Sequence, residues 1–290
     1  MFDSILFPTD GNEGADRVFE FVLDVAAARG ATVHLLNVAD TNVTSHADTD
    51  TGTTDVLVER GERLVGDLGD RARERNVDVT EAVIQGVPFS TITEYADRHG
   101  MDAIVMPTHG RGVLGRFLLG SVATRVVRTA DVPVLTVRPE AELRTPFDDV
   151  LVATDGSDCA EDAVERATAV AAADGATLHV VSVVELAAYG PDAHSSLNID
   201  TFEERAEAAA ESAREVAESH GVDVETHVAY GGVHDNVLRG VERTGADLVV
   251  LGTHGRTGFD RYLLGSVAEK VVRTAPVPVL TVRESGAESE

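Results

Sequence analysis

Two loops rich in glycine have the composition expected of a site that holds a phosphate group. One spans residues 107–121 and the other residues 252–266, and both contain Thr-His-Gly-Arg near the start and Leu-Leu-Gly-Ser at the end. Glycine lets backbone N–H groups approach an anion that a Cβ would hold away. The N–H groups at a helix start, with the positive end of the helix dipole, complete such a cradle. The two loops therefore predict phosphate binding.

The local charge also favours an anion. The chain has a formal net charge of −26, yet residues 103–130 contain no Asp or Glu and carry Arg111, Arg116, Arg125 and Arg128. The equivalent stretch of the second loop is weaker, because two acids offset part of its positive charge. A reading without ligand remains open, in which the glycines serve tight turns and the arginines pair with surface acids.

Other polar residues are expected beside these loops. Ser121 and Ser266 stand where a helix would begin, so each hydroxyl could cap that helix or contact a phosphate. Pro-Thr-Asp-Gly at residues 8–11 and Ala-Thr-Asp-Gly at residues 153–156 each follow an apolar strand pattern. Ligands of open parallel sheets bind beyond the carboxyl ends of strands where the strand order reverses, and both pairs of loops suit that crevice.

The chain repeats itself. Each position n of the first half corresponds to position n + 145 of the second, and the two halves make up the 290 residues. Each copy is large enough to enclose its own core. We expect a domain over residues 1–138, a linker over 139–147, a second domain over 148–284 and a polar tail over 285–290.

Short β-branched runs alternate with longer helical stretches in both copies, which predicts an α/β fold built on a parallel sheet covered on both faces. The strands expected in the first copy cover residues 5–7, 33–38, 77–84, 103–106 and 132–137. Those of the second copy cover residues 150–153, 178–183, 222–229, 248–251 and 277–282. The segments 39–54 and 185–200 differ between the copies and read either as solvated loops or as lids over a ligand.

At these loops the chain resembles the universal stress protein family. The nucleotide-binding branch of that family carries Gly-x2-Gly-x9-Gly-Ser/Thr after the fourth strand, and Gly252, Gly255, Gly265 and Ser266 match it. The resemblance covers the chain as two tandem domains. It implies two Rossmann-like domains, each an open five-stranded parallel sheet of order 3-2-1-4-5, with ATP held between the first and fourth strands.

The resemblance also implies a role for each matching residue. Asp10 and Asp155 would lie near the adenine or ribose, beside Thr9 and Thr154, with Pro8 and Ala153 in the same loops. The base would meet Val38, Val183, Met106 and Leu251. The phosphates would be held by Gly110, Gly120, Ser121, Gly252, Gly255, Gly265 and Ser266, with backbone N–H groups added by Val122 and Val267. Mg²⁺ or Mn²⁺ would arrive on the phosphates.

The first copy departs from the family pattern at Pro107, where the first motif glycine should stand. Proline has no N–H to donate, so that contact is lost or reshaped. We therefore expect tighter ATP binding in the second copy. The stronger positive charge of the first copy argues in the opposite direction.

Three functional classes follow: an ATP-binding regulatory stress protein with at most slow hydrolysis, a paired scaffold that uses no nucleotide, and an ATP-dependent enzyme. The chain has no P-loop lysine motif, and no nucleophile or second carboxylate accompanies His109 or His254, which disfavours the enzyme. No Cys/His cluster has zinc spacing, so no protein metal site is expected. The intact motif of the second copy favours the first class.

The composition limits which binding partners and which cellular compartment are expected. The acidity argues against nucleic acid, and no apolar run reaches the roughly 20 residues that span a bilayer. Cys159 is the only cysteine and Lys270 the only lysine. A single cysteine predicts a cytoplasmic protein without disulfides. Many carboxylates with a single lysine suggest a salt-adapted, halophilic protein. The resemblance further implies pairing of the two domains through residues 132–138 and 277–283, and a homodimer.

Overall fold

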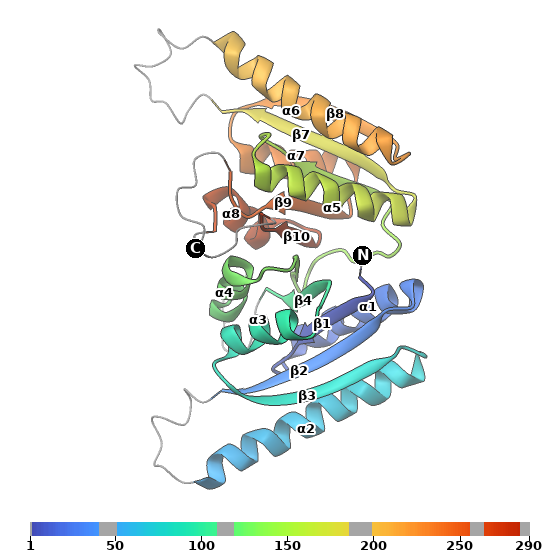
Figure 1. Ribbon diagram of the computed structural model, residues 1–290, viewed down its shortest axis with the longest axis vertical. Helices are drawn as coiled ribbons and strands as arrows, with labels where there is room; N and C mark the ends of the chain where they lie inside the picture. Colours follow the sequence, from blue (N-terminus) through green and yellow to red (C-terminus); the bar gives the residue numbers. More distant parts are fainter. Residues whose placement is uncertain (1, 41–50, 109–118, 186–198, 256–263, 285–290) are drawn as a thin grey trace. The chain divides into compact units, whose positions relative to one another are not determined.

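The computed structural model describes residues 2–40, 51–108, 119–185, 199–255 and 264–284 (Figure 1). The chain divides into two compact units, Met1–Glu140 and Ala141–Glu290, which we call unit 1 and unit 2. Within the described residues, no helix is both long enough and apolar enough to cross a membrane.

Unit 1 alternates strands and helices. Its elements are β1 (Ser4–Pro8), α1 (Glu13–Arg29), β2 (Thr32–Asp40), α2 (Thr51–Glu74), β3 (Val79–Gly86), α3 (Pro88–Arg98), β4 (Ala103–Pro107), α4 (Ser121–Thr129) and β5 (Val134–Val137). The sheet has the order β3-β2-β1-β4-β5, and its neighbouring strands pair in parallel. The strand order reverses between β1 and β4.

Unit 2 repeats this architecture. Its elements are β6 (Asp149–Ala153), α5 (Asp158–Asp174), β7 (Thr177–Val184), α6 (Ile199–Ser219), β8 (Val224–Tyr230), α7 (Val233–Thr244), β9 (Leu248–Gly252), α8 (Ser266–Thr274) and β10 (Val279–Val282). The parallel order is β8-β7-β6-β9-β10. The predicted fold class, two Rossmann-like α/β units with the order 3-2-1-4-5, is confirmed.

The helices of each unit cover both faces of its sheet. The chain moves from β1 to β2 to β3 in one direction, then returns to β4 and continues to β5 in the other. Right-handed crossovers therefore place α1 and α2 on one face and α3 and α4 on the other. Contacts within each pair agree: Arg71 of α2 bonds Asp16 of α1, and Arg125 of α4 lies 4.9 Å from the ring centroid of Phe89 on α3.

The central strands are buried because helices cover both sides. All five residues of β4 are buried, and so are four of the five in β1. The fifth strand of each unit starts two residues later than the sequence predicted, at Val134 and Val279. Pro133 and Pro278 precede these residues and cannot donate a ladder N–H, so regular pairing begins after them.

The chain turns sharply where β1 and β6 end. Gly11 and Gly156 have φ values of 73° and 69°, in the left-handed region that favours glycine. After Gly11, Asn12 caps α1 by accepting a hydrogen bond from the Ala15 N–H at 3.0 Å. The turn sets the aspartate before each glycine, Asp10 or Asp155, at the carboxyl edge of the sheet.

Candidate functional site

Each unit has a cavity at the carboxyl ends of its central strands, where the strand order reverses. The cavity of unit 1 has a volume of about 470 Å³ and that of unit 2 about 340 Å³. Parallel sheets bind ligands in this crevice because loops and helix N-termini converge there. The position agrees with the crevice expected from the sequence.

The cavities bring together the residues that the sequence singled out. In unit 1 the lining includes Pro8, Thr9, Asp10, Val38, Met106, Gly120, Ser121 and Val122. In unit 2 it includes Ala153, Thr154, Asp155, Val183, Leu251, Gly252, Gly255, Gly265, Ser266 and Val267. Gly110 and His109 lie outside the described residues. The grouping is a fact of the structure, whereas the role of each residue toward a ligand stays a prediction.

In unit 2 the carboxylate of Asp155 is held by the turn that carries it. Its Oδ1 accepts hydrogen bonds from the N–H and Oγ of Ser157 at 3.0 and 2.6 Å. The other oxygen, Oδ2, faces the second loop, since a Cβ on Gly255 would lie only 2.8 Å from it. Glycine at position 255 allows this close approach, because a side chain there would force the loop or the carboxylate to move.

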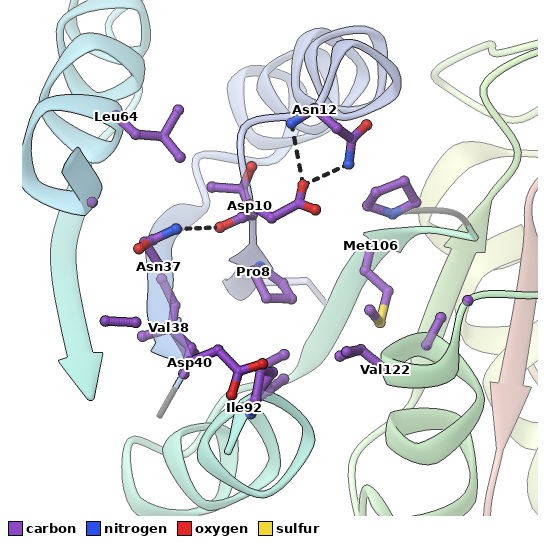
Figure 2. Close-up of a pocket in the computed structure, with 18 of the residues that line it drawn as sticks. Pro8, Asp10, Asn12, Asn37, Val38, Asp40, Leu64, Ile92, Met106 and Val122 are labelled. Carbon is purple, nitrogen blue, oxygen red and sulfur yellow. Dashed lines mark hydrogen bonds between the residues drawn. The ribbon is translucent and has the colours of Figure 1, made fainter. Parts of the chain in front are cut away.

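In unit 1 a similar turn carries Asp10 (Figure 2). Its Oδ1 accepts from the backbone N–H of Asn12 at 3.2 Å and from Asn12 Nδ2 at 2.6 Å. Asn37 of β2 adds a bond from its Nδ2 to the Thr9 carbonyl at 2.8 Å. The exposed Asp10 side chain thus stands at the mouth of the cavity in a fixed orientation.

Each glycine-rich loop ends at the start of a helix, where the first backbone N–H groups have no hydrogen-bond partner within the helix. Gly120 and Gly265 each donate their N–H to the carbonyl of Thr108 or Thr253 at 2.8 Å, which brings both ends of the loop together. These glycines are the N-caps of α4 and α8 and have no side chain to cap the helix. The first N–H groups of each helix have no partner within the helix, and they carry the positive end of its dipole. Such a terminus suits an anion.

The two units differ at the end of the fourth strand. Backbone N–H groups of residues 104 and 108 bond to carbonyls of residues 133 and 137 on the β5 side, and those of 249 and 253 bond to carbonyls of residues 278 and 282 on the β10 side. Donors alternate along a parallel strand, so the nitrogens of Pro107 and Gly252 face the opposite side, toward β1 and β6. Pro107 therefore costs the sheet no ladder bond. It does remove one donor from the crevice that Gly252 retains.

Apolar residues form the rest of each cavity, and several were not anticipated from the sequence. Met106 and Leu251 are buried at the cavity floor. The inner face of the long second helix adds lining residues in both units. They are Leu57, Arg60, Gly61 and Leu64 from α2, and Phe202, Arg205 and Ala206 from α6. Their helical spacing and their recurrence at the offset of 145 are visible in the sequence, but neither signal shows that these residues line a cavity.

The side chains do not offer a metal cage. Within the described ranges, no group of three or more His, Cys, Asp or Glu residues could hold a metal ion. Mg²⁺ and Mn²⁺ prefer several oxygens, including water and phosphate oxygens. A divalent ion would therefore fit only as a companion of bound phosphates, with Asp10 or Asp155 as the nearest carboxylate of the turn.

Comparison with known proteins agrees with the repeated fold. The sequence model of the Universal stress protein family matches residues 1–138 and 146–283. A universal stress protein of Mycobacterium tuberculosis is 32% identical over 237 residues, which make up 78% of this chain and 78% of that protein. One from Methanocaldococcus jannaschii is 33% identical over 138 residues, 47% of this chain and 81% of that protein. The crystal structure of a universal stress protein from Archaeoglobus fulgidus gives a TM-score of 0.77 at 25% identity, covering 98% of this chain and 100% of that one.

Proposed function

Because the chain belongs to the universal stress protein family, as two tandem copies of the family domain, we propose that it is a nucleotide-responsive stress protein that binds ATP. Unit 2 is the tighter site. Nucleotide occupancy changes the shape or the partners of the protein, and hydrolysis is slow at most.

One observation carries this proposal. All ten residues that the sequence predicted for unit 2 line a single cavity, in which the start of α8 and the Asp155 turn both take part. Backbone donors at the helix start suit the phosphates, and a carboxylate suits the ribose hydroxyls. The buried Leu251 supplies an apolar surface for a planar base.

The chemistry of the site supports binding over turnover. In the described lining of unit 2, the only side chain with a histidine ring is His254, and its Nδ1 lies 2.8 Å from the Thr253 hydroxyl. A general base for hydrolysis must reach the attacking water through its second ring nitrogen, and Nε2 of His254 is buried. We therefore assign His254 to holding the loop.

The proposal can be tested with purified protein in native mass measurement and calorimetric titration. Retained or added ATP should appear as a fixed mass increment, with at most two per chain. Asp155→Asn keeps the size of the side chain but removes its charge, and we expect it to weaken ATP binding at the tighter site. Asp158→Asn, in the first turn of α5 and not among the lining residues, is the matched control and should bind ATP as the wild type does.

The result that would overturn the proposal is equally direct. If the wild-type chain shows no ATP increment and no heat of binding at any salt concentration, it does not bind the nucleotide. A scaffold that acts without nucleotide would then be the better description.

A further inference from the structure

An arginine interrupts the apolar inner stripe of the second helix in both units. On α2 the cavity-lining positions are Leu57, Arg60, Gly61 and Leu64, spaced i, i+3, i+4 and i+7. On α6 they are Phe202, Arg205 and Ala206, at the equivalent positions. This spacing marks the side of a helix that faces inward, and both arginines are among the residues that line the cavities.

These two arginines have no partner in the part of the chain that the structure describes. The other arginines on α2 do: Arg63 bonds the Glu59 carbonyl, and Arg71 and Arg73 each bond carboxylates. On α6, Arg214 bonds Glu211. Arg60 and Arg205 are exposed at the cavity and no bond or ion pair of theirs is found within the described residues. Their donors and charge are available to a ligand.

In unit 1 the second helix lies across the cavity from the start of α4 (Figure 2). Figure 2 shows Leu64 on α2 at one side of the pocket, with Val122 at the start of α4 at the other. If the phosphates occupy the start of α4 or α8, the α2 and α6 wall faces the opposite end of the ligand. That end of a nucleotide is the base.

We propose that Arg60 and Arg205 contact the base of the bound nucleotide, with the guanidinium plane against the face of the ring. This inference rests on the proposed function. It identifies one arginine in each unit as the residue that selects a planar, aromatic ligand. A guanidinium group is planar and weakly hydrated, and it stacks on aromatic faces more readily than an ammonium group does. In unit 2, Phe202 lies one turn earlier on the same helix face and offers a second aromatic surface.

Three ligands distinguish a base contact from a phosphate contact. ATP, adenosine and inorganic tripolyphosphate are titrated into the full chain carrying Arg205→Gln. We expect the Kd values for ATP and adenosine to rise by about three- to tenfold, the range of a cation–π contact, while that for tripolyphosphate stays unchanged. Arg60→Gln should act in the same way on the weaker site.

Matched variants make the result interpretable. Arg214→Gln removes an arginine from the same helix that is not part of the cavity lining and should leave all three affinities unchanged. Arg205→Lys keeps the charge but not the plane, so it should restore the adenosine affinity only in part. Unfolding midpoints of all variants check that the fold is intact.

Two results would overturn the inference. A loss for ATP and tripolyphosphate without a loss for adenosine would make these arginines phosphate ligands, and equal affinities for Arg205→Gln and wild type would make them solvated side chains. Failure of the wild type to bind ATP is a different outcome, because it removes the proposed function itself.

Discussion

The cavities of the two units occupy the same place in a repeated fold. They differ in which of two neighbouring positions carries the larger side chain. In unit 2 a Cβ on Gly252 would lie 2.9 Å from the Cys159 carbonyl oxygen and 3.0 Å from its Sγ. The equivalent positions in unit 1 hold Pro107 and Gly14. The larger residue stands on the helix in one unit and at the strand end in the other. Close packing limits the total volume of the two side chains in each pair. It does not determine whether the residue at the strand end has a backbone N–H to donate.

A second exchange lies beneath the second helix. A Cβ on Gly61 would stand 2.5 Å from the Oδ1 of Asn37 and 2.9 Å from the Cγ1 of Val83, so a side chain on α2 at this position would force these neighbours to shift. In unit 2 the equivalent pair is the shorter, buried Ser182 and Ala206. The polar side chain that unit 1 places against Thr9 is thus accommodated by the loss of one methyl group from the helix.

The largest effect we expect comes from Gly255→Val. The new side chain would overlap Asp155 Oδ2, which lies 2.8 Å from the Cβ position, so the loop must move away from the carboxylate. Loss of one or more charged contacts weakens binding about tenfold or more. In calorimetric titration the tighter ATP site should disappear.

The site of unit 1 serves as the internal control for that variant. Its affinity should not change, and the number of ATP molecules bound per chain should fall from two to one. Two sites of unaltered affinity in Gly255→Val would show that the loop does not bind the nucleotide in unit 2.

Gly61→Ala should destabilise unit 1 by about 1–3 kcal/mol, the usual cost of overpacking, because the methyl group meets Asn37. Hydrogen exchange of α2 and β2 peptides would measure this within the unit. Gly66→Ala is the matched control on the same helix. No atom lies within 4 Å of its added Cβ, so that variant should be neutral or gain up to about 1 kcal/mol from helix propensity.

The double variant Asn37→Ser, Gly61→Ala carries the same two residues as the equivalent pair of unit 2. It tests whether the residue at position 37 determines which residue is tolerated at position 61. Residues in contact give non-additive free energies, so the double variant should recover most of the loss caused by Gly61→Ala. Additive losses would mean that the two positions vary independently.

Most of the fold could be predicted from the sequence, because the repeat and the buried strands leave a strong pattern. The alternation of β-branched runs with helical stretches gave the element order, and the described ends of the glycine-rich loops lie at the crevice where they were expected. Strand ends were less predictable. The sequence does not show that β5 begins only after Pro133. It also does not show that β2 extends to Asp40.

The inner wall of the cavity could not be predicted, because it depends on the approach of distant elements. Nothing local marks Arg60 as inward-facing, since an arginine on a helix usually faces solvent. Only the packing of α2 against β2 brings Arg60 and Leu57 to the end of β1. The requirement for glycine at position 61 likewise arises from Asn37, which is 24 positions away in the sequence.

Pro107→Gly should bring the site of unit 1 closer to that of unit 2. The substitution restores an N–H on the side of β4 that faces β1, where a ligand can accept it. One additional hydrogen bond would tighten ATP binding by roughly three- to tenfold. An unchanged affinity in calorimetric titration would mean that this position does not cause the difference between the sites.

The units also differ in how they hold the histidine of their second strand. His34 Nδ1 lies 3.0 Å from the Tyr95 hydroxyl, with the His99 ring stacked on Tyr95, whereas His179 of unit 2 lies 2.7 Å from Asp149 Oδ1. Burial, and secondarily the charge of His99, hold the pKa of His34 below its ordinary value of 6.5. The folded unit 1 therefore favours the neutral ring.

Stability from His34 is consequently present above pH 6.5 and is lost as the pH falls through the lowered pKa of the folded state. Urea unfolding of wild type and His34→Asn at pH 7.5 and pH 5.5 checks this. The variant should lose less stability on acidification, and His220→Asn, an exposed histidine at the end of α6, should behave as the wild type. Identical pH dependence in His34→Asn and wild type would remove His34 as the cause.

The smallest effect concerns ion pairs between the first two helices, which only unit 1 has at these positions. Arg71 bonds Asp16 at 2.9 Å and Glu20 at 2.5 Å, and Arg75 bonds Glu20 at 3.0 Å. Unit 2 has Val216 and His220 at the positions of the two arginines. The Arg71 side chain is 37% exposed, so Arg71→Gln should destabilise unit 1 by less than about 1 kcal/mol.

Salt separates the two ways in which Arg71 can act. Charge pairing is screened at molar salt, whereas packing of its guanidinium carbon 5.2 Å from the Phe19 ring centroid is not. A loss seen only in dilute buffer would assign the effect to charge. It would also fit a chain of net charge −26 that relies on salt to mute its self-repulsion. A loss that persists at molar salt would assign it to packing, and full stability of the wild type in dilute buffer would contradict the salt-adapted origin.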